Sequence, residues 1–416
     1  MRDRIVTTAI ISFDEDICNE IYKSLCYSTH VNLIIIKNKD QQFLYTYRCK
    51  VIDINEGSDY EIIANYKRLI EENNLELLFI ASSIINKEII LLANHLDINI
   101  ANGSSFKCYE KDSQHNLIND ITHKFLIEYL NETNNLRLEL EEIISIVTKD
   151  VTKYSQLGTV EAKKIVFDCF RDRHGNTILV TPIFYFSDSL ERIFYNGIDD
   201  AIDSIIHFVN KLGDRFGFRG PWSFDINFDQ DAIGYDYLKE IKFLPAHTGW
   251  IFHRAKGINI PLLCVQDFLD RDIQIMPLID SNKLMWSAEM ELFIDIEYSV
   301  IFIDLDETVI IENEKVPIVL DLLKKAKSDS KIIILLTRHK KNIISTLEKS
   351  FIDVGIFNKV IHVLESEKKS DKIKLESENI NGKMIFIDNE FPERRDVSNN
   401  CNIPVFDVNG IDFILQ

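Results

Sequence analysis

Residues Ile301–Thr308 read Ile-Phe-Ile-Asp-Leu-Asp-Glu-Thr, an apolar strand that ends in two aspartates two residues apart. Because side chains alternate along a strand, Asp304 and Asp306 are expected to leave the strand's end on the same side. Two crowded carboxylates repel each other unless a cation or a proton lies between them. Open α/β sheets bind ligands at the edge formed by the carboxyl ends of their strands. The stretch therefore predicts an α/β fold with a charged site at that edge.

Three further segments continue the pattern downstream. They are an apolar run ending in a hydroxyl residue, a lysine-rich helix start, and an apolar run ending in an acid: Lys331–Thr337, Glu367–Lys374 and Lys383–Asp388. In this order the four motifs resemble those of the haloacid dehalogenase-like phosphohydrolases, and the resemblance covers residues 298–416. It implies a Rossmann-like domain, and the short stretch between the first two motifs leaves no room for a large cap.

The resemblance also implies a role for each matching residue. Asp304 would attack phosphorus and form an aspartyl-phosphate, and carboxylates are known covalent nucleophiles. Asp306 would be the general acid and base. Thr337 would hydrogen-bond the phosphoryl oxygens. Lys369 would neutralise the charge shared by nucleophile and phosphate, with Lys372 as the alternative because sequence alone does not fix the helix register.

A magnesium ion is the implied cofactor. Asp388 would complete its site with Asp304 and the main-chain carbonyl of Asp306, since ligation by oxygen alone suits magnesium. The family often has a second acid in the fourth motif. Here that position is an amide, and its possible substitutes are two nearby acids: Asn389, then Glu390 or Glu393. The outer metal ligand therefore stays open.

Length and composition limit the function classes. A chain of 416 residues exceeds one usual core, so two or three domains are expected. The net charge of −19 disfavours general binding to nucleic acid or anionic membranes. Seven dispersed cysteines without a Cys-x-x-Cys favour reduced thiols over disulfides or zinc. With no apolar run of membrane-spanning length and no signal-peptide core, the sequence predicts a cytoplasmic protein whose partner is a phosphorylated small molecule or nucleotide.

The first hundred residues alternate short apolar runs with amphipathic stretches, which predicts a small parallel sheet built from βαβ units. The apolar runs are Ile5–Ser12, Val31–Ile36, Val51–Ile54, Leu75–Ser82 and Ile98–Ala101. No Gly-x-Gly-x-x-Gly follows the first run, so a dinucleotide role has no support.

The middle of the chain predicts a β-hairpin of alternating polarity, with Asp225 on one strand and Glu240 on the other. A Lys-Gly-Ile-Asn-Ile-Pro stretch follows at Lys256–Pro261. This run resembles the C-terminal core of ATP-grasp proteins, especially the carbamoyl-phosphate synthase and amino-acid ligase branch. The resemblance covers residues 1–275, and the N-terminal sheet would match the domain that precedes an ATP-grasp fold.

Two departures from the ATP-grasp pattern bear on ATP use. Lys242 stands where the family has a metal-ligating asparagine beside Glu240, and a protonated lysine cannot ligate a metal. No glycine occurs between Gly103 and Gly158, so a loop that cradles phosphate is missing. The possible ATP-grasp site is thus Asp225 with Glu240 and Lys242, in a contracted fold that has lost ligation.

Together these patterns predict three domains. They are a Rossmann-like pre-ATP-grasp domain, a contracted α+β ATP-grasp-like domain and a haloacid dehalogenase-like domain, over residues 1–105, 106–295 and 296–416. The main functional prediction is a magnesium-dependent phosphohydrolase that uses the ATP-grasp-like region to bind or cover its substrate. Two alternatives stay open. One is a carboxylate-amine ligase that works through an acyl-phosphate and has an accessory C-terminal domain, and the other is a nucleotide sensor without turnover.

Overall fold

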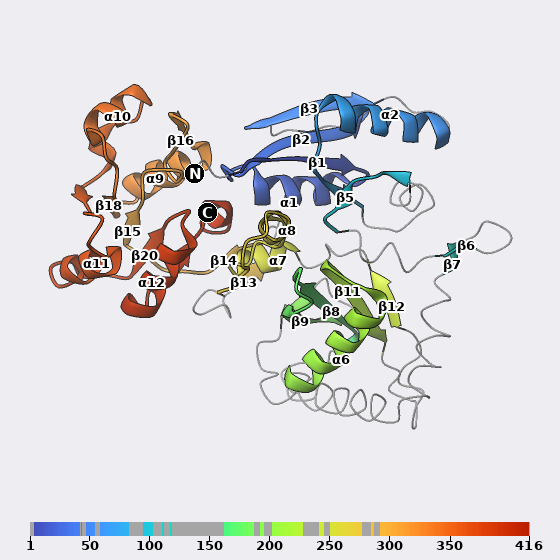
Figure 1. The fold of residues 1–416 in the computed structure, drawn as a ribbon. Coiled ribbons are helices and arrows are strands. Elements are labelled where there is room, and N and C mark those ends of the chain that lie inside the picture. Colours follow the sequence, from blue (N-terminus) through green and yellow to red (C-terminus); the bar gives the residue numbers. More distant parts are fainter. Residues whose placement is uncertain are drawn as a thin grey trace. The chain divides into compact units, whose positions relative to one another are not determined.

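A computed structural model describes most of the chain (Figure 1). The described residues are 4–41, 43, 47–54, 59–82, 95–102, 110–111, 117–118, 162–186, 192–194, 202–227, 241–244, 250–276, 284–286 and 292–415. The chain contains two compact units: Met1–Ile21, Asn32–Gly249 and Leu263–Gln274 form the first, and Tyr22–Val31, Trp250–Leu262 and Ile275–Gln416 form the second. The three predicted domain boundaries stay a prediction.

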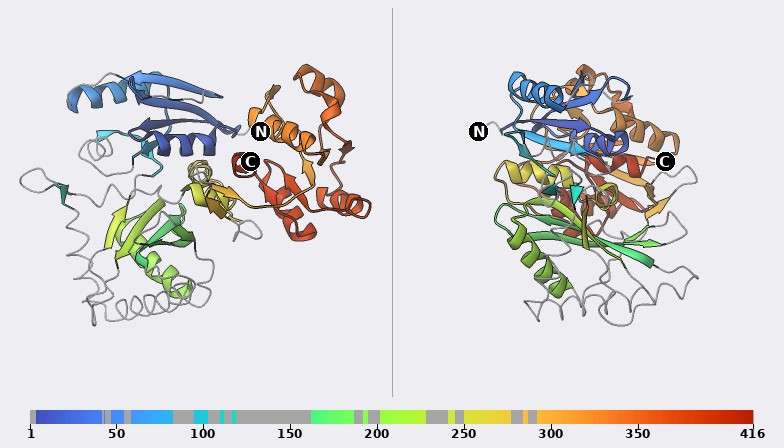
Figure 2. Two further views of the ribbon diagram at one scale, coloured as in Figure 1. Left: turned by 180° about the vertical axis from the view of Figure 1, so that it is seen from behind. Right: turned by 90° about the vertical axis from the view of Figure 1, so that its right-hand side faces the viewer.

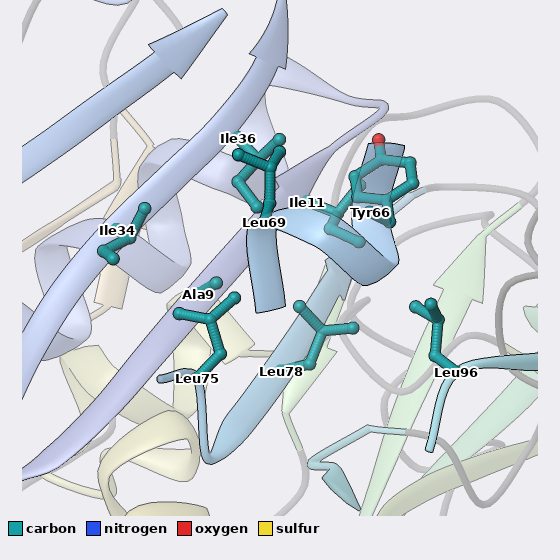
Figure 3. Packing of buried hydrophobic residues seen from close by; sticks show 9 residues of the cluster. All are labelled: Ala9, Ile11, Ile34, Ile36, Tyr66, Leu69, Leu75, Leu78 and Leu96. Atoms are coloured by element: carbon teal, nitrogen blue, oxygen red, sulfur yellow. The ribbon is translucent and has the colours of Figure 1, made fainter. Parts of the chain in front are cut away.

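The N-terminal part forms the parallel sheet that the apolar runs predict. Its strands are β1 (Val6–Ser12), β2 (Val31–Asn38), β3 (Cys49–Ile54), β4 (Leu77–Ala81) and β5 (Asn99–Ile100), in the order β3-β2-β1-β4-β5. The helices α1 (Glu15–Leu25) and α2 (Asp59–Glu72) lie between strands in the sequence. Figure 3 shows Tyr66 and Leu69 of α2 beside Ile11 of β1 and Ile36 of β2, all in one apolar cluster. Burial of each such aliphatic side chain stabilises the fold by about 1.5–3 kcal/mol.

The middle part forms an antiparallel sheet. Its strands are β8 (Ala162–Arg171), β9 (Thr177–Phe186), β10 (Arg192–Phe194), β11 (Gly220–Asn227) and β12 (Ile241–Leu244), in the order β10-β9-β8-β11-β12, and α6 (Ile202–Phe216) accompanies them. The predicted antiparallel pairing of the hairpin strands is confirmed, and its register places Asp225 opposite Lys242, while Glu240 lies outside the described residues. Gly220 has φ of +75°, and a Cβ there would lie 2.8 Å from the carbonyl oxygen of Ala101, so only glycine fits.

Short elements complete the middle of the chain. They are the pairs β6 (Glu110–Lys111) with β7 (Leu117–Ile118) and β13 (Leu284–Trp286) with β14 (Leu292–Ile294), and the helices α7 (Trp250–Ala255) and α8 (Ile260–Phe268). Among the helices of the described ranges, none is long and apolar enough to cross a membrane.

The C-terminal part is a second parallel sheet, coloured orange to red in Figures 1 and 2. Its strands are β15 (Val300–Ile303), β18 (Ile332–Thr337), β19 (Lys359–His362), β20 (Met384–Ile387) and β21 (Val405–Phe406), in the order β19-β18-β15-β20-β21. The other elements are α9 (Pro317–Ser328), α10 (Ile343–Lys349), α11 (Lys369–Ser377), α12 (Phe391–Cys401), the 3-10 helices η4 (Val354–Ile356) and η5 (Val408–Phe413), and a hairpin of β16 (Ile310–Ile311) and β17 (Glu314–Lys315).

The central strands of this sheet are buried, as continuous apolar runs predict for parallel strands covered on both faces. The protein is therefore a mixed α/β protein with parallel sheets, and the three apolar runs of the C-terminal motifs form β15, β18 and β20. The finer assignment of this part to the haloacid dehalogenase-like family is not confirmed.

Candidate functional site

Three polar side chains meet the carboxyl edge of the C-terminal sheet because their strands are neighbours. Strand β15 pairs in parallel with β18 on one side and with β20 on the other. Asp304 directly follows β15, Thr337 ends β18, and Asp388 directly follows β20. The amide of Asp304 donates to the carbonyl of Ile387 at 3.0 Å, which holds the ends of β15 and β20 together.

A lysine from the start of α11 joins the two aspartates. The Nζ atom of Lys369 donates to Oδ1 of Asp304 at 2.6 Å and to Oδ2 of Asp388 at 2.7 Å. All three residues are buried, with exposed fractions of 3%, 6% and 0% in that order. Lys372, the alternative lysine, instead donates to Glu367 at 2.6 Å. The structure thus brings Lys369 to the carboxylates.

Burial controls the protonation of this Asp304–Lys369–Asp388 cluster. Desolvation and then the nearby Asp388 charge raise the pKa of Asp304 to about 7, although Lys369 opposes the shift. Desolvation likewise raises the pKa of Asp388 against the opposing Lys369. Burial alone would lower the pKa of Lys369, but the two carboxylates outweigh it and raise that pKa. A single ammonium group therefore hydrogen-bonds to two carboxyl groups, and their mutual repulsion favours a state in which one of the two is protonated.

Asp306 lies in different surroundings. Its side chain is 54% exposed, and its Oδ1 lies 2.8 Å from Nδ1 of His339. Strand β15 ends at Ile303, and the next residue after Asp306, Glu307, has a φ of +57°. Besides burial and the charge of Asp388, the charge of Asp306 raises the pKa of Asp304. The expectation that Asp304 and Asp306 share one side stays a prediction.

The remaining candidate residues surround the buried cluster. The amide of Asn389 donates to Oγ1 of Thr308 at 3.1 Å, and its Nδ2 donates to Glu307 at 3.2 Å. The amide of Glu390 donates to Oδ1 of Asp388 at 2.8 Å, which orients that carboxylate. Glu393 accepts from Arg338 at 3.1 Å, so it is occupied by an ion pair.

The predicted magnesium site falls where these side chains meet. Across the part of the chain that the structure describes, no group of three or more His, Cys, Asp or Glu side chains could hold a metal ion. The ammonium of Lys369 fills the gap between Asp304 and Asp388, and Asp306 contacts His339. The cation between the buried carboxylates is the lysine ammonium, and the magnesium site with the Asp306 carbonyl stays a prediction.

Two residues of the site, Arg338 and His339, have no role in the sequence prediction. Arg338 donates to the carbonyl of Glu367 at 2.7 Å and also to that of Leu364, which holds the loop before α11 and so places Lys369. His339 contacts Asp306. Arg338 and His339 are the first and second residues after Thr337, and this place after a motif strand is the sequence signal for them.

The possible ATP-grasp site is described only in part. Asp225 and Lys242 are opposite each other in the β11–β12 ladder, and Glu240 lies outside the described residues. The Lys-Gly-Ile-Asn-Ile-Pro stretch has a structural role, because Oδ1 of Asn259 accepts from the amide of Leu262 at 3.1 Å and caps α8. The Nδ2 of Asn259 donates to the carbonyl of Ser24 at 2.7 Å.

Comparisons with known proteins give distant structural similarity alone. Neither a protein-family model nor a curated protein matches this chain. The biotin carboxylase domain of Hydrogenobacter thermophilus 2-oxoglutarate carboxylase, in complex with MgADP, ADP and bicarbonate, is 11% identical, with a TM-score of 0.35 over 66% of this chain and 72% of that one.

Two further solved structures are similar at the same level. The N5-carboxyaminoimidazole synthetase of Staphylococcus aureus, complexed with ADP, is 10% identical, with a TM-score of 0.36 over 65% of this chain and 79% of that one. Glycinamide-RNase-transformylase T of Mycobacterium tuberculosis is 10% identical, with a TM-score of 0.38 over 66% of this chain and 84% of that one.

These comparisons correct the main functional prediction. The similar structures are ATP-grasp ligases and carboxylases, and they include the type of protein that residues 1–275 resemble. They favour the ligase alternative over the predicted phosphohydrolase, and the prediction of a phosphatase as the enzyme class is wrong on this finding.

Proposed function

We propose that this chain is an ATP-dependent ligase of the carboxylate-amine type that works through an acyl-phosphate. The observation that carries the proposal is the order of its sheets. A parallel sheet, β3-β2-β1-β4-β5, is followed by an antiparallel sheet, β10-β9-β8-β11-β12, whose β11–β12 pair at one edge carries Asp225 and Lys242. This is the order that the ATP-grasp resemblance of the sequence implies.

The reaction brings negative charges together, so the site needs positively charged groups. A carboxylate oxygen of the substrate attacks the γ-phosphorus of ATP, which releases ADP, and an amine then displaces phosphate from the acyl carbon. Both steps bring anionic oxygens together, so a fixed positive charge lowers the barrier. Lys242 supplies a charge of that sign at the ladder position opposite Asp225, and it fits phosphate or carboxylate oxygens better than a metal's ligand shell.

ADP formation from ATP and magnesium tests the proposal directly. The full-length protein is incubated with pooled carboxylates and hydroxylamine, which traps an acyl-phosphate as a hydroxamate. We expect ADP and hydroxamate in equal amounts from the wild type. The Lys242→Met variant should lose on the order of 100-fold in rate, because it removes the fixed positive charge. The Glu240→Gln variant should lose a similar factor, because it removes the acid that the ATP-grasp resemblance assigns to the metal.

The Asp304→Asn variant is the matched control for this experiment. It removes a carboxylate from the C-terminal sheet edge and leaves the β11–β12 hairpin intact, so its ADP formation should stay at the wild-type rate. Loss of ADP formation in Asp304→Asn together with retention in Glu240→Gln would contradict the proposal.

A second candidate, a nucleotide sensor without turnover, is favoured by Lys242 itself. Lys242 pairs with Asp225 in the ladder, at the position where the resemblance implies a metal ligand, and a protonated lysine cannot ligate a metal. Calorimetry with ATP and with a non-hydrolysable analogue separates the two. Equal binding of both nucleotides, without ADP formation over any carboxylate pool, would favour the sensor.

A further inference from the structure

A second group of polar side chains lies beside the buried cluster and shares none of its hydrogen bonds. Nδ1 of His339 lies 2.8 Å and 3.1 Å from the two carboxylate oxygens of Asp306. The other ring nitrogen, Nε2, lies 2.9 Å from Oγ1 of Thr346 on α10. A carboxylate, an imidazole and a hydroxyl thus form one continuous chain of hydrogen bonds.

The acceptor capacity of the carboxylate decides the direction of these bonds. An ionised carboxylate can only accept, so Nδ1 of His339 carries the hydrogen that Asp306 accepts. In a neutral imidazole the other nitrogen is then an acceptor, and Nε2 receives the hydroxyl hydrogen of Thr346. This is the tautomer in which a histidine can take a proton from a hydroxyl group.

Further hydrogen bonds hold His339 and the start of the helix that carries Thr346. The amide of His339 donates to Oγ1 of Thr337 at 3.1 Å, and its carbonyl accepts from Nε2 of His362 at 3.0 Å. The side chain of Asn342 caps α10 by accepting from the amide of Ser345 at 2.9 Å, and so it holds the turn that carries Thr346. The imidazole of His339 is only 11% exposed, and its hydrogen bond to Thr346 is part-buried, whereas its contact with Asp306 is exposed.

We propose that Thr346 is a nucleophile for activated acyl compounds such as esters, with His339 as its general base and Asp306 as the carboxylate that orients the ring. A nucleophile hydrogen-bonded to a base, which is in turn oriented by a third group, is the arrangement that activates a hydroxyl for acyl transfer. The proposal stands on these contacts and does not depend on the ligase reaction.

The reaction balances within the three residues, the substrate and water. Oγ1 of Thr346 forms a bond to the acyl carbon while its proton passes to Nε2 of His339. The bond to the leaving alkoxide then breaks, and that oxygen takes the proton from Nε2. Water attacks the threonyl ester in the same manner, which releases the carboxylic acid and returns the proton to Oγ1.

Covalent labelling of the full-length protein by a fluorophosphonate tests the proposal, because the probe forms a phosphorus–oxygen bond with an activated hydroxyl and releases fluoride. We expect peptide mapping to find the label on Thr346. Labelling should vanish in Thr346→Val, persist in Thr346→Ser, and slow by about 100-fold or more in His339→Gln, which loses its general base. Asp306→Asn should also slow it, because the ring loses its orienting acceptor.

The neighbouring hydroxyl gives the matched control. The hydroxyl of Ser345 makes no contact with His339 among the described interactions, so Ser345→Ala should label at the wild-type rate. An unlabelled Thr346 in the wild type, or an unchanged rate in His339→Gln, overturns the proposal. If Thr346→Val fails to fold, His339→Gln and Ser345→Ala decide the result. ADP formation should be unchanged in Thr346→Val, so failure here is separate from failure of the ligase.

Discussion

The C-terminal sheet edge and the start of α8 both carry residues that a family motif marks, yet they use them differently. At the sheet edge, Lys369 joins Asp304 and Asp388 in a buried cluster whose charges are poorly matched. At α8, Asn259 caps a helix and holds the carbonyl of Ser24. The difference teaches that motif residues can form a buried cluster of unbalanced charge in one region and hold the backbone in another, so a motif alone does not assign chemistry.

The largest expected effect comes from removing the single cation of the buried cluster. In Lys369→Met, the carboxylates of Asp304 and Asp388 would face each other without a partner. We expect the free energy of unfolding at pH 8 to fall by about 3–5 kcal/mol, as for other buried pairs that lose one member. Urea denaturation followed by circular dichroism measures it.

The matched control for that variant is Lys372→Met on the same helix. Lys372 pairs with Glu367 near the surface, and such pairs contribute about 0–1 kcal/mol. Equal losses of unfolding free energy in the two variants would show that Lys369 contributes no more to stability than a surface ion pair does. The contrast between the sheet edge and α8 would then disappear.

A smaller effect is expected from pH, through Asp304. Its pKa is about 7 in the folded protein and about 4 when unfolded, so between these values the folded state binds more protons. Stability therefore falls as the pH rises from about 4 to about 7, by on the order of 1.4 kcal/mol for each unit of effective pKa difference, and then levels off.

Asp304→Asn separates this titration from all others in the chain. The decrease in stability between pH 4 and pH 7 should become shallower in the variant, which has no carboxyl group to protonate at position 304. The measurement is a series of urea titrations at fixed ionic strength. An unchanged slope would mean that Asp304 does not carry the proton, and a rise in stability over that range attributable to Asp304 would reverse the sign.

The C-terminal sheet could be predicted from sequence because its physical signal is local. Continuous apolar runs of strand length, each ending in a polar residue, give both the strands and the edge at which Asp304, Thr337 and Asp388 gather. Lys369 could only be narrowed to two candidates, since one helical turn separates it from Lys372. The partner of Asp306 could not be predicted, because it depends on where β15 ends.

In the middle of the chain, the sequence predicts the strands but not the roles of individual side chains. The hairpin was predicted from alternation, and the ladder between Asp225 and Lys242 follows from it. The role of Asn259 was not predicted, because a helix cap and a ligand-binding amide look alike in sequence. A side-chain oxygen that precedes an apolar helix by one residue is the signal that could have identified the cap.

The smallest expected effect tests that cap and sharpens the comparison. Asn259→Ala removes the acceptor for the amide of Leu262 and the donor to Ser24, and we expect a loss of about 1 kcal/mol in unfolding free energy. Asn259→Asp keeps the capping oxygen and loses only the donor, so it should recover most of that loss. Because the residue is structural, ADP formation at a temperature well below unfolding should be the same in all three proteins. A large loss of ADP formation in Asn259→Asp, with stability retained, would instead place Asn259 in a ligand site. The start of α8 would then no longer be a purely structural region.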